Sequence, residues 1–340
     1  MFDMEMEHQN DRKNAIKKLK LLAYNGKGDV EAFRHKLDSA FSTVFLPNGV
    51  ECSTHKYGTI DCDVLSPEIY ASNRVMLYIH GGSFVGGSPA AYRSFCSSLA
   101  TKCFCRVVVP QIRLAPSSPY PAANEDIQAV FRALYTEEQI ACSLNAEKGS
   151  AAAQSEIIIA ADGSGASIAC SLIFNLRDRY RANIKNVILF SPWLDISSDS
   201  PLLTSKKLND EILTPEVFRK SSAVYIFESN SETLHVSPLF ASDDDLKNFP
   251  PVIIQLGGRE VLLENAKAFA KRLEDCGNEC ILDVWPDMMF MFQMADEYLY
   301  ESHLALDRIG KIVTGGSEDG KKKQQFENKP KLERGLNSEA

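Results

Sequence analysis

Short apolar runs alternate with longer amphipathic segments along most of the chain. The apolar runs are rich in valine and isoleucine and lie at 74–79, 106–111, 156–161, 186–191, 251–256 and 280–285. Helical spacing of apolar residues is found at 91–102, 123–136, 165–181, 262–276 and 294–312. Buried strands that alternate with helices predict an α/β fold, with a mostly parallel central sheet that carries helices on both faces.

Three segments lie outside this alternation and set the predicted domain organisation. Residues 1–50 are amphipathic and helical in pattern, and we interpret them as an N-terminal helical cap segment. Residues 205–232 also have helical periodicity and are interpreted as a second cap segment. The core would then consist of 51–204 and 233–314. Residues 315–340 are polar and charge-rich, a composition that cannot bury a core, so we expect a disordered tail.

Composition and charge narrow the class of protein. The chain has 340 residues, 44% of them hydrophobic, and a net charge of −8, which disfavours nucleic-acid binding because phosphate contacts need a basic surface. No apolar run approaches the roughly 18 residues of a membrane span. The N-terminus is charged without a signal-like apolar stretch, and the nine cysteines form no CxxC pair. We therefore predict a cytoplasmic protein with reduced thiols, no metal site and no cofactor.

Candidate chemistry lies at the end of the run 156–161. A strand, a corner of small residues and a helix are the setting of the nucleophile elbow G-x-S-x-G. Laid over residues 161–165, ADGSG, that pattern places Gly163 at the nucleophilic serine, and Ser164 follows one position later. A second candidate is His80-Gly81-Gly82 after the run 74–79, because glycines there let backbone N–H groups approach a ligand closely, as in an oxyanion hole.

Four further motifs occur together in an order that is typical of one known family. HGGSF at 80–84, IRLAPSSPYPAANED at 112–126, FSPWLDIS at 190–197 and VSPLFAS at 236–242 occur in the order found in that family. The chain thus resembles the hormone-sensitive-lipase-type branch of the α/β-hydrolases, which is marked by an HGGG-like motif and a GDSAG elbow. The resemblance implies an α/β-hydrolase fold with a helical cap.

The resemblance also implies a Ser–His–acid triad, in which the histidine takes the serine's proton and the acid orients the histidine. On this chain the serine position is Gly163 and the histidine position is Phe290; no histidine occurs between His235 and His303. The acid position is Glu260, which is equally well read as an exposed loop carboxylate.

The remaining parts of the implied site are the oxyanion-hole amides of Gly81, Gly82 and Ser164. The hydroxyl of Ser164 suits a cap at the start of the following helix. Glycine at the elbow adopts a left-handed conformation at little cost, so the turn itself is expected to persist.

Three functional hypotheses remain open. The first is an inactive pseudo-esterase that binds a small apolar or acyl ligand, since loss of one triad member typically costs about 10⁴ to 10⁶ in rate. The second is an active carboxylesterase that uses Ser164 with a non-standard base. The third is a structural or interaction protein whose pocket is filled by Phe290 and neighbouring methionines. A cavity beneath residues 80–83 would distinguish the first hypothesis from the third.

Overall fold

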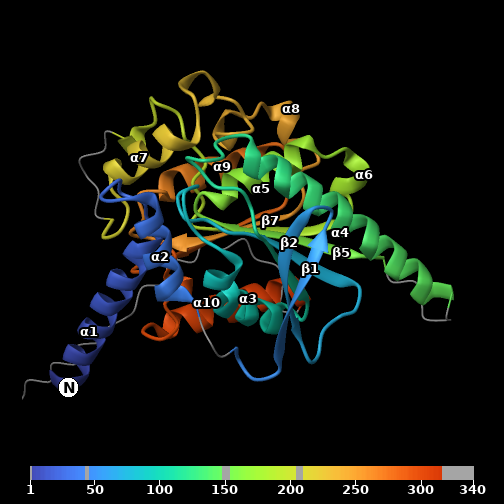
Figure 1. The fold of residues 1–340 in the computed structure, drawn as a ribbon, viewed down its shortest axis with the longest axis horizontal. Helices are drawn as coiled ribbons and strands as arrows, with labels where there is room; N and C mark the ends of the chain where they lie inside the picture. Colours follow the sequence, from blue (N-terminus) through green and yellow to red (C-terminus); the bar gives the residue numbers. More distant parts are fainter. Residues whose placement is uncertain (1, 43–45, 148–153, 204–209, 316–340) are drawn as a thin grey trace, which may run out of the picture.

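A single eight-stranded sheet organises the computed structural model, which describes residues 2–42, 46–147, 154–203 and 210–315 (Figure 1). Its strand order is β1-β2-β4-β3-β5-β6-β7-β8. The pairs β1–β2 and β2–β4 are antiparallel, and the other pairs are parallel. The strands are β1 (Val50–Tyr57), β2 (Ile60–Pro67), β3 (Arg74–Ile79), β4 (Arg106–Pro110), β5 (Glu156–Asp162), β6 (Ile184–Phe190), β7 (Val252–Gly257) and β8 (Cys280–Trp285). The predicted mostly parallel sheet is confirmed.

Helices cover both faces of the sheet, with α3 and α10 on one side and α4, α5 and α9 on the other (Figure 1). The helices are α1 (Phe2–Leu19), α2 (Val30–Phe41), α3 (Pro89–Cys103), α4 (Ala122–Glu147), α5 (Gly165–Asn175), α6 (Asp178–Arg181), α7 (Pro215–Tyr225), α8 (Asp243–Leu246), α9 (Leu263–Asp275) and α10 (Tyr300–Thr314). Short 3₁₀ turns are η1 (Lys20–Leu22), η2 (Pro201–Leu203), η3 (Glu228–Asn230), η4 (Pro238–Phe240) and η5 (Phe292–Met294).

Some predicted boundaries were wrong. The helix expected over 165–181 is two helices, α5 and α6, because Leu176 adopts an extended conformation after α5. The helix expected from 294 begins only at Tyr300, because residues 292–294 form the separate turn η5. Residues 316–340 of the expected disordered tail (315–340) and residues 205–209 of the second cap segment lie outside the described residues.

The N-terminal helices are tied to the loop after β3. The Arg34 guanidinium donates to the carbonyl of Val85 (2.8 Å) and to that of Ala115 (3.0 Å). The backbone amide of Tyr24 donates to Ser83 Oγ (3.0 Å), and the carbonyl of Tyr24 accepts from Ser221 on α7 (3.4 Å). The two segments that we interpret as caps therefore meet beside the loop after β3 that begins with His80-Gly81-Gly82, which we call the HGG loop.

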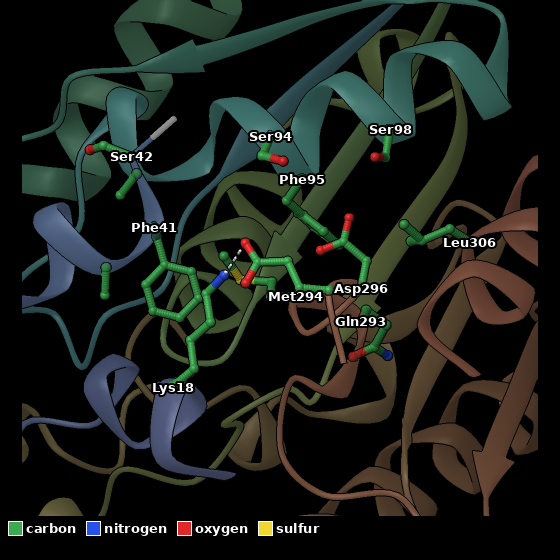
Figure 2. Close-up of a pocket in the computed structure, with 13 residues that line it drawn as sticks. Lys18, Phe41, Ser42, Ser94, Phe95, Ser98, Gln293, Met294, Asp296 and Leu306 are labelled. Carbon is green, nitrogen blue, oxygen red and sulfur yellow. Dashed lines mark ion pairs between the residues drawn. The ribbon is translucent and has the colours of Figure 1, made fainter. Parts of the chain in front are cut away.

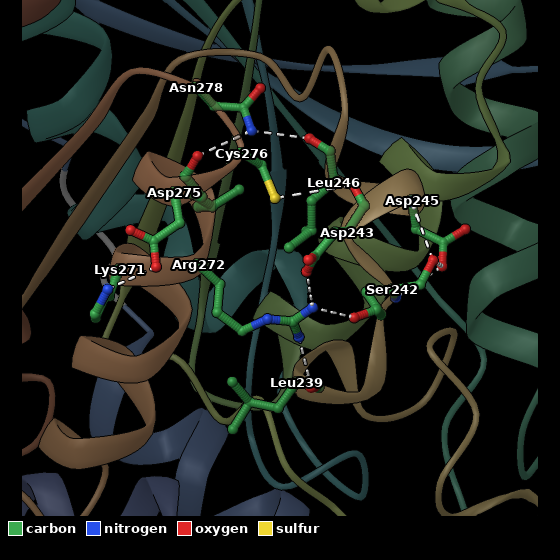
Figure 3. Close-up of polar contacts among 12 residues, drawn as sticks. Leu239, Ser242, Asp243, Asp245, Leu246, Lys271, Arg272, Asp275, Cys276 and Asn278 are labelled. Carbon is green, nitrogen blue, oxygen red and sulfur yellow. Dashed lines mark hydrogen bonds and ion pairs between the residues drawn. The ribbon is translucent and has the colours of Figure 1, made fainter.

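A polar cluster centred on Arg272 fastens the segment 236–246 to α9 (Figure 3). Its guanidinium donates to the carbonyls of Leu239 (3.0 Å) and Ala241 (2.6 Å) and pairs with Asp243 (2.9 Å). The motif VSPLFAS thus has a structural role, because its backbone carbonyls are held by one arginine. No helix among the described residues has the length and apolar character needed to cross a membrane.

Candidate functional site

The turn between β5 and α5 keeps the geometry of a nucleophile elbow. Gly163 has φ +47°, in the left-handed region that favours glycine. Its N–H donates to the carbonyl of Phe190 (3.0 Å), and its carbonyl accepts from the amide of Trp193 (2.9 Å). A Cβ on Gly165 would lie only 2.3 Å from the carbonyl oxygen of Ile79, so glycine is needed there for α5 to pack against β3. The turn therefore persists although residue 163 has no side chain.

A buried carboxylate joins this elbow to the HGG loop. Asp162 Oδ1 accepts from Tyr78 Oη (2.8 Å) and from the amide of Gly81 (2.8 Å), and Oδ2 accepts from Tyr92 Oη (3.1 Å). Asp162 is only 1% exposed, and burial raises its pKa to about 6 against the opposing effect of these hydrogen bonds. At neutral pH the group is therefore mainly a carboxylate that holds β3, α3 and β5 together.

The HGG loop differs in one respect from the predicted oxyanion hole. The amide of Gly81 donates to Asp162 and so does not face the elbow. Among the described residues the amides of Gly82, Ser83 and Ser164 have no protein acceptor. The sequence analysis did not include Ser83, because it considered only the two glycines of the HGG motif and Ser164 as backbone donors. Ser83 adopts φ +62°, a strained conformation for a residue with a side chain.

The hydroxyl of Ser164 is turned away from the nucleophile position. Ser164 Oγ accepts from the amide of Phe84 (3.1 Å), and the residue is 4% exposed. It makes no capping hydrogen bond to α5, so the predicted helix cap was wrong. The ring of Phe84 stacks on that of Tyr225 with centroids 3.7 Å apart. The side chain of Ser164 thus fixes the HGG loop, and the stacked rings join that loop to α7.

Phe290 lies directly opposite the elbow. A Cβ built on Gly163 would be 3.3 Å from Phe290 Cζ, which is closer than most side-chain contacts. Phe290 is 6% exposed, and Met289 and Met291 on either side are also buried. The phenyl ring of Phe290 therefore occupies the space that a side chain on residue 163 would enter.

Glu260 is a buried group, so the interpretation as an exposed loop carboxylate was wrong. Its Oε1 accepts from Ser191 Oγ (2.8 Å) and from the amide of Gly257 (2.5 Å), and Ser191 Oγ accepts in turn from the amide of Met291 (3.1 Å). Its Oε2 has no partner among the described residues. Burial raises the pKa of Glu260 well above its usual range.

The histidines His80, His55 and His303 lie away from the elbow residues and from Glu260 in their hydrogen bonding. His80 is buried, and its Nδ1 lies 2.9 Å from the carbonyl of Gly81. His55 is exposed and pairs with Glu137 (3.1 Å), and His303 is exposed on α10. Within the described residues no histidine has a hydrogen bond to Ser164 or to Glu260. No group of three His, Cys, Asp or Glu residues in that part of the chain has the geometry to hold a metal ion.

A small polar cavity of about 130 Å³ adjoins the loop that carries Phe290 (Figure 2). Lys18 crosses it from α1, pairing with Glu297 (3.0 Å) while its Nζ lies 5.2 Å from the centre of the Phe41 ring. A larger cavity lies between α4, α5 and α6. Neither of these two cavities is lined by Gly82, Ser164 or Phe290.

Comparison with known proteins shows that this chain is similar to esterases. A protein-family model with the description α/β hydrolase fold matches residues 76–294 of this chain. The chain is 28% identical to an acetyl-hydrolase of Streptomyces hygroscopicus, over 73% of this chain and 78% of the relative. It is 29% identical to an esterase of Acinetobacter venetianus, over 72% and 76%. The crystal structure of an esterase from the bacterial hormone-sensitive lipase family is similar with a TM-score of 0.77 and 25% identity, covering 90% of this chain and 98% of that one.

Substituting Gly163→Ala should lower the free energy of unfolding by about 1–2 kcal/mol, because the new Cβ meets both a left-handed backbone and the Phe290 ring. In a Phe290→Ala background the steric part should vanish and the cost of Gly163→Ala should shrink. Urea unfolding of the double-mutant cycle measures this coupling. Gly277→Ala is the matched control, since Gly277 has φ +83° with no atom near its Cβ position. If the costs of Gly163→Ala and Phe290→Ala were additive, a steric contact between residues 163 and 290 would be contradicted.

Substituting Glu260→Gln should change the pH dependence of stability. The native glutamate keeps its proton at pH values where the unfolded chain has lost it, so wild-type stability falls as pH rises above about 4.5. Glutamine does not titrate. The free energy of unfolding of the Glu260→Gln variant, relative to that of wild type, should therefore rise by about 1 kcal/mol or more between pH 5 and pH 8. Urea unfolding at both pH values tests this, with the exposed Glu264→Gln as control. Parallel pH profiles of wild type and Glu260→Gln would exclude a raised pKa.

Proposed function

This chain belongs to the hormone-sensitive-lipase-type branch of the α/β-hydrolase family, and we propose that within it the chain is a pseudo-esterase. The similar proteins are named an acetyl-hydrolase and esterases, so ester hydrolysis is the activity that the family leads one to expect. The observation that carries the proposal is the pairing of Gly163 with Phe290: a residue without a side chain faces a phenyl ring where hydrolysis needs a hydroxyl and an imidazole.

The state of Glu260 supports the same conclusion. A triad acid works as a carboxylate that orients the histidine. Here the pKa of Glu260 is raised by burial, and Oε1 is held by Ser191 and the amide of Gly257. The carboxyl group thus stabilises the loops after β6 and β7 and has no imidazole to orient.

The alternative of an active carboxylesterase that uses Ser164 has less support. A serine nucleophile needs a base within hydrogen-bond reach of its oxygen. The hydrogen-bond partner of Ser164 Oγ in the described part of the chain is the amide of Phe84, which can only donate. That bond uses a lone pair of the hydroxyl oxygen, and no base among the described residues is placed to accept the hydroxyl proton.

Two non-catalytic roles follow from different observations. The unpaired amides of Gly82 and Ser164 favour a small apolar or acyl ligand whose oxygen accepts from them, with the segments 1–50 and 205–232 as caps. The Phe290 ring against Gly163 favours a packed site and an interaction role. Binding to the amides would require that ring to move. All nine cysteines are free, which supports the proposed cytoplasmic location.

The purified protein should not hydrolyse short p-nitrophenyl esters above the rate in buffer, because no described group is placed to attack the carbonyl carbon. A fluorophosphonate probe should leave it unlabelled for the same reason. The acetyl-hydrolase of Streptomyces hygroscopicus, assayed in parallel, is the positive control. Stoichiometric labelling that maps to Ser164 and disappears in Ser164→Ala would establish the active-esterase alternative.

Restoring both missing side chains should restore hydrolysis. Gly163→Ser and Phe290→His supply nucleophile and base on an intact elbow, while either change alone lacks a partner and should stay inactive. The double variant should hydrolyse p-nitrophenyl acetate at least about tenfold faster than either single variant, and only above a pH of about 6–7, where imidazole is neutral.

The matched control is Gly163→Ser with Phe290→Gln, which has similar polarity and no base. Binding of butyrate to wild type and to Phe290→Ala separates the two non-catalytic roles. A ligand site should bind butyrate in wild type, whereas a packed site should bind it only after the ring is removed. A folded double variant that neither turns over nor reacts with the probe would mean that the oxyanion amides are not aligned with residue 163.

A further inference from the structure

A second groove lies between α4, α5 and α6, which lie side by side (Figure 1), and its α5 residues are at the C-terminal end of that helix, opposite to the end that carries the elbow. Its volume is about 620 Å³, within the range of small-molecule sites. The floor is apolar: Phe131 and Leu172 are buried, and the rings of Tyr135 and Tyr180 meet edge to face with centroids 4.9 Å apart. An apolar body of a ligand would therefore lose its water shell on entering this groove.

The polar rim of this groove carries charge of one sign. Arg132, Arg177 and Arg179 line it, and none of its lining residues is acidic. Within the described part of the chain none of these arginines forms an ion pair, whereas the whole protein has a net charge of −8. Three guanidinium groups that form no ion pair within the described residues surround one cavity of an acidic protein. Such a cavity is complementary to an anion.

One of these arginines is held in place at the rim. The guanidinium of Arg179 lies 4.6 Å from the centre of the Tyr180 ring and donates to Tyr180 Oη (2.7 Å). Asn183 in turn donates to Tyr135 Oη (3.3 Å), so the polar ends of both tyrosines are also fixed. An oriented guanidinium loses less side-chain entropy when it binds a planar carboxylate.

We propose that the groove between α4, α5 and α6 is a binding site for an amphipathic organic carboxylate, with its apolar chain on the floor of Phe131, Leu172, Tyr135 and Tyr180 and its carboxylate at the arginine rim. The proposal concerns a cavity separate from the elbow and does not rest on the proposed function. The apolar floor and the cationic rim are separate surfaces. The ligand should therefore bind in one orientation, with its chain toward the floor and its carboxylate at the rim.

Isothermal titration of the full-length protein with decanoate at pH 7.5 tests this site. We expect a Kd on the order of 100 μM, given the size of the ligand. Decanol, which has the same chain without the charge, should bind at least tenfold more weakly. Raising the salt concentration should weaken decanoate binding, because the arginines are exposed to solvent.

The double variant Arg132→Gln/Arg177→Gln should bind decanoate at least tenfold more weakly, and both residues are exposed, so the fold should be kept. Leu176→Trp, which narrows the groove, should also weaken binding. Arg219→Gln on α7 is the matched control, because Arg219 is exposed and lies outside the groove. Hydrogen exchange should show protection by decanoate in residues 128–140 and 172–180.

Several outcomes would overturn the proposal: no binding of decanoate at 1 mM, equal affinity for decanol, or unchanged affinity in the arginine double variant. Protection confined to residues 80–84 and 286–294 would place the ligand at the elbow, and would likewise overturn it.

Discussion

The carboxylate of Asp162 is the interaction on which the architecture of the site depends. It lies at the end of β5 and accepts hydrogen bonds from β3, from α3 and from the amide of Gly81. Because it is buried, each of these donors is expensive to leave unpaired. The HGG loop and the elbow are therefore kept in register by a residue beside the nucleophile position, and the scaffold does not depend on the nucleophile itself.

Because of this separation, the backbone at the elbow keeps its geometry with glycine at residue 163. Glycine relaxes the left-handed conformation that a serine at residue 163 would hold under strain. The phenyl ring of Phe290 packs where a polar imidazole would have needed partners in a buried site. Ser191 links Glu260 to the amide of Met291, so the loop at residues 288–294 is anchored without a triad. Under the proposed function, Gly163 and Phe290 favour stability where the family pattern favours reactivity.

The fold was largely predictable because the central strands are buried on both faces and so consist of continuous apolar runs. β5 and β7 were recognised on this basis. The antiparallel strands β1 and β2 were missed, since β1 is an edge strand rich in polar, exposed residues and carries no such run. Periodicity also joined α5 to α6, because an apolar pattern does not register the extended residue Leu176 between them.

The sequence by itself determined that residue 163 carries no hydroxyl and residue 290 no imidazole, and motif spacing led to the proposal that these are the positions of the nucleophile and the base. Only the tertiary structure decided what the remaining groups do. The burial of Glu260, the direction of Ser164 Oγ and the use of the Gly81 amide depend on atoms from strands and loops distant in sequence. The physical reason is that hydrogen bonds and pKa values are set by neighbours in space, which residue spacing does not specify.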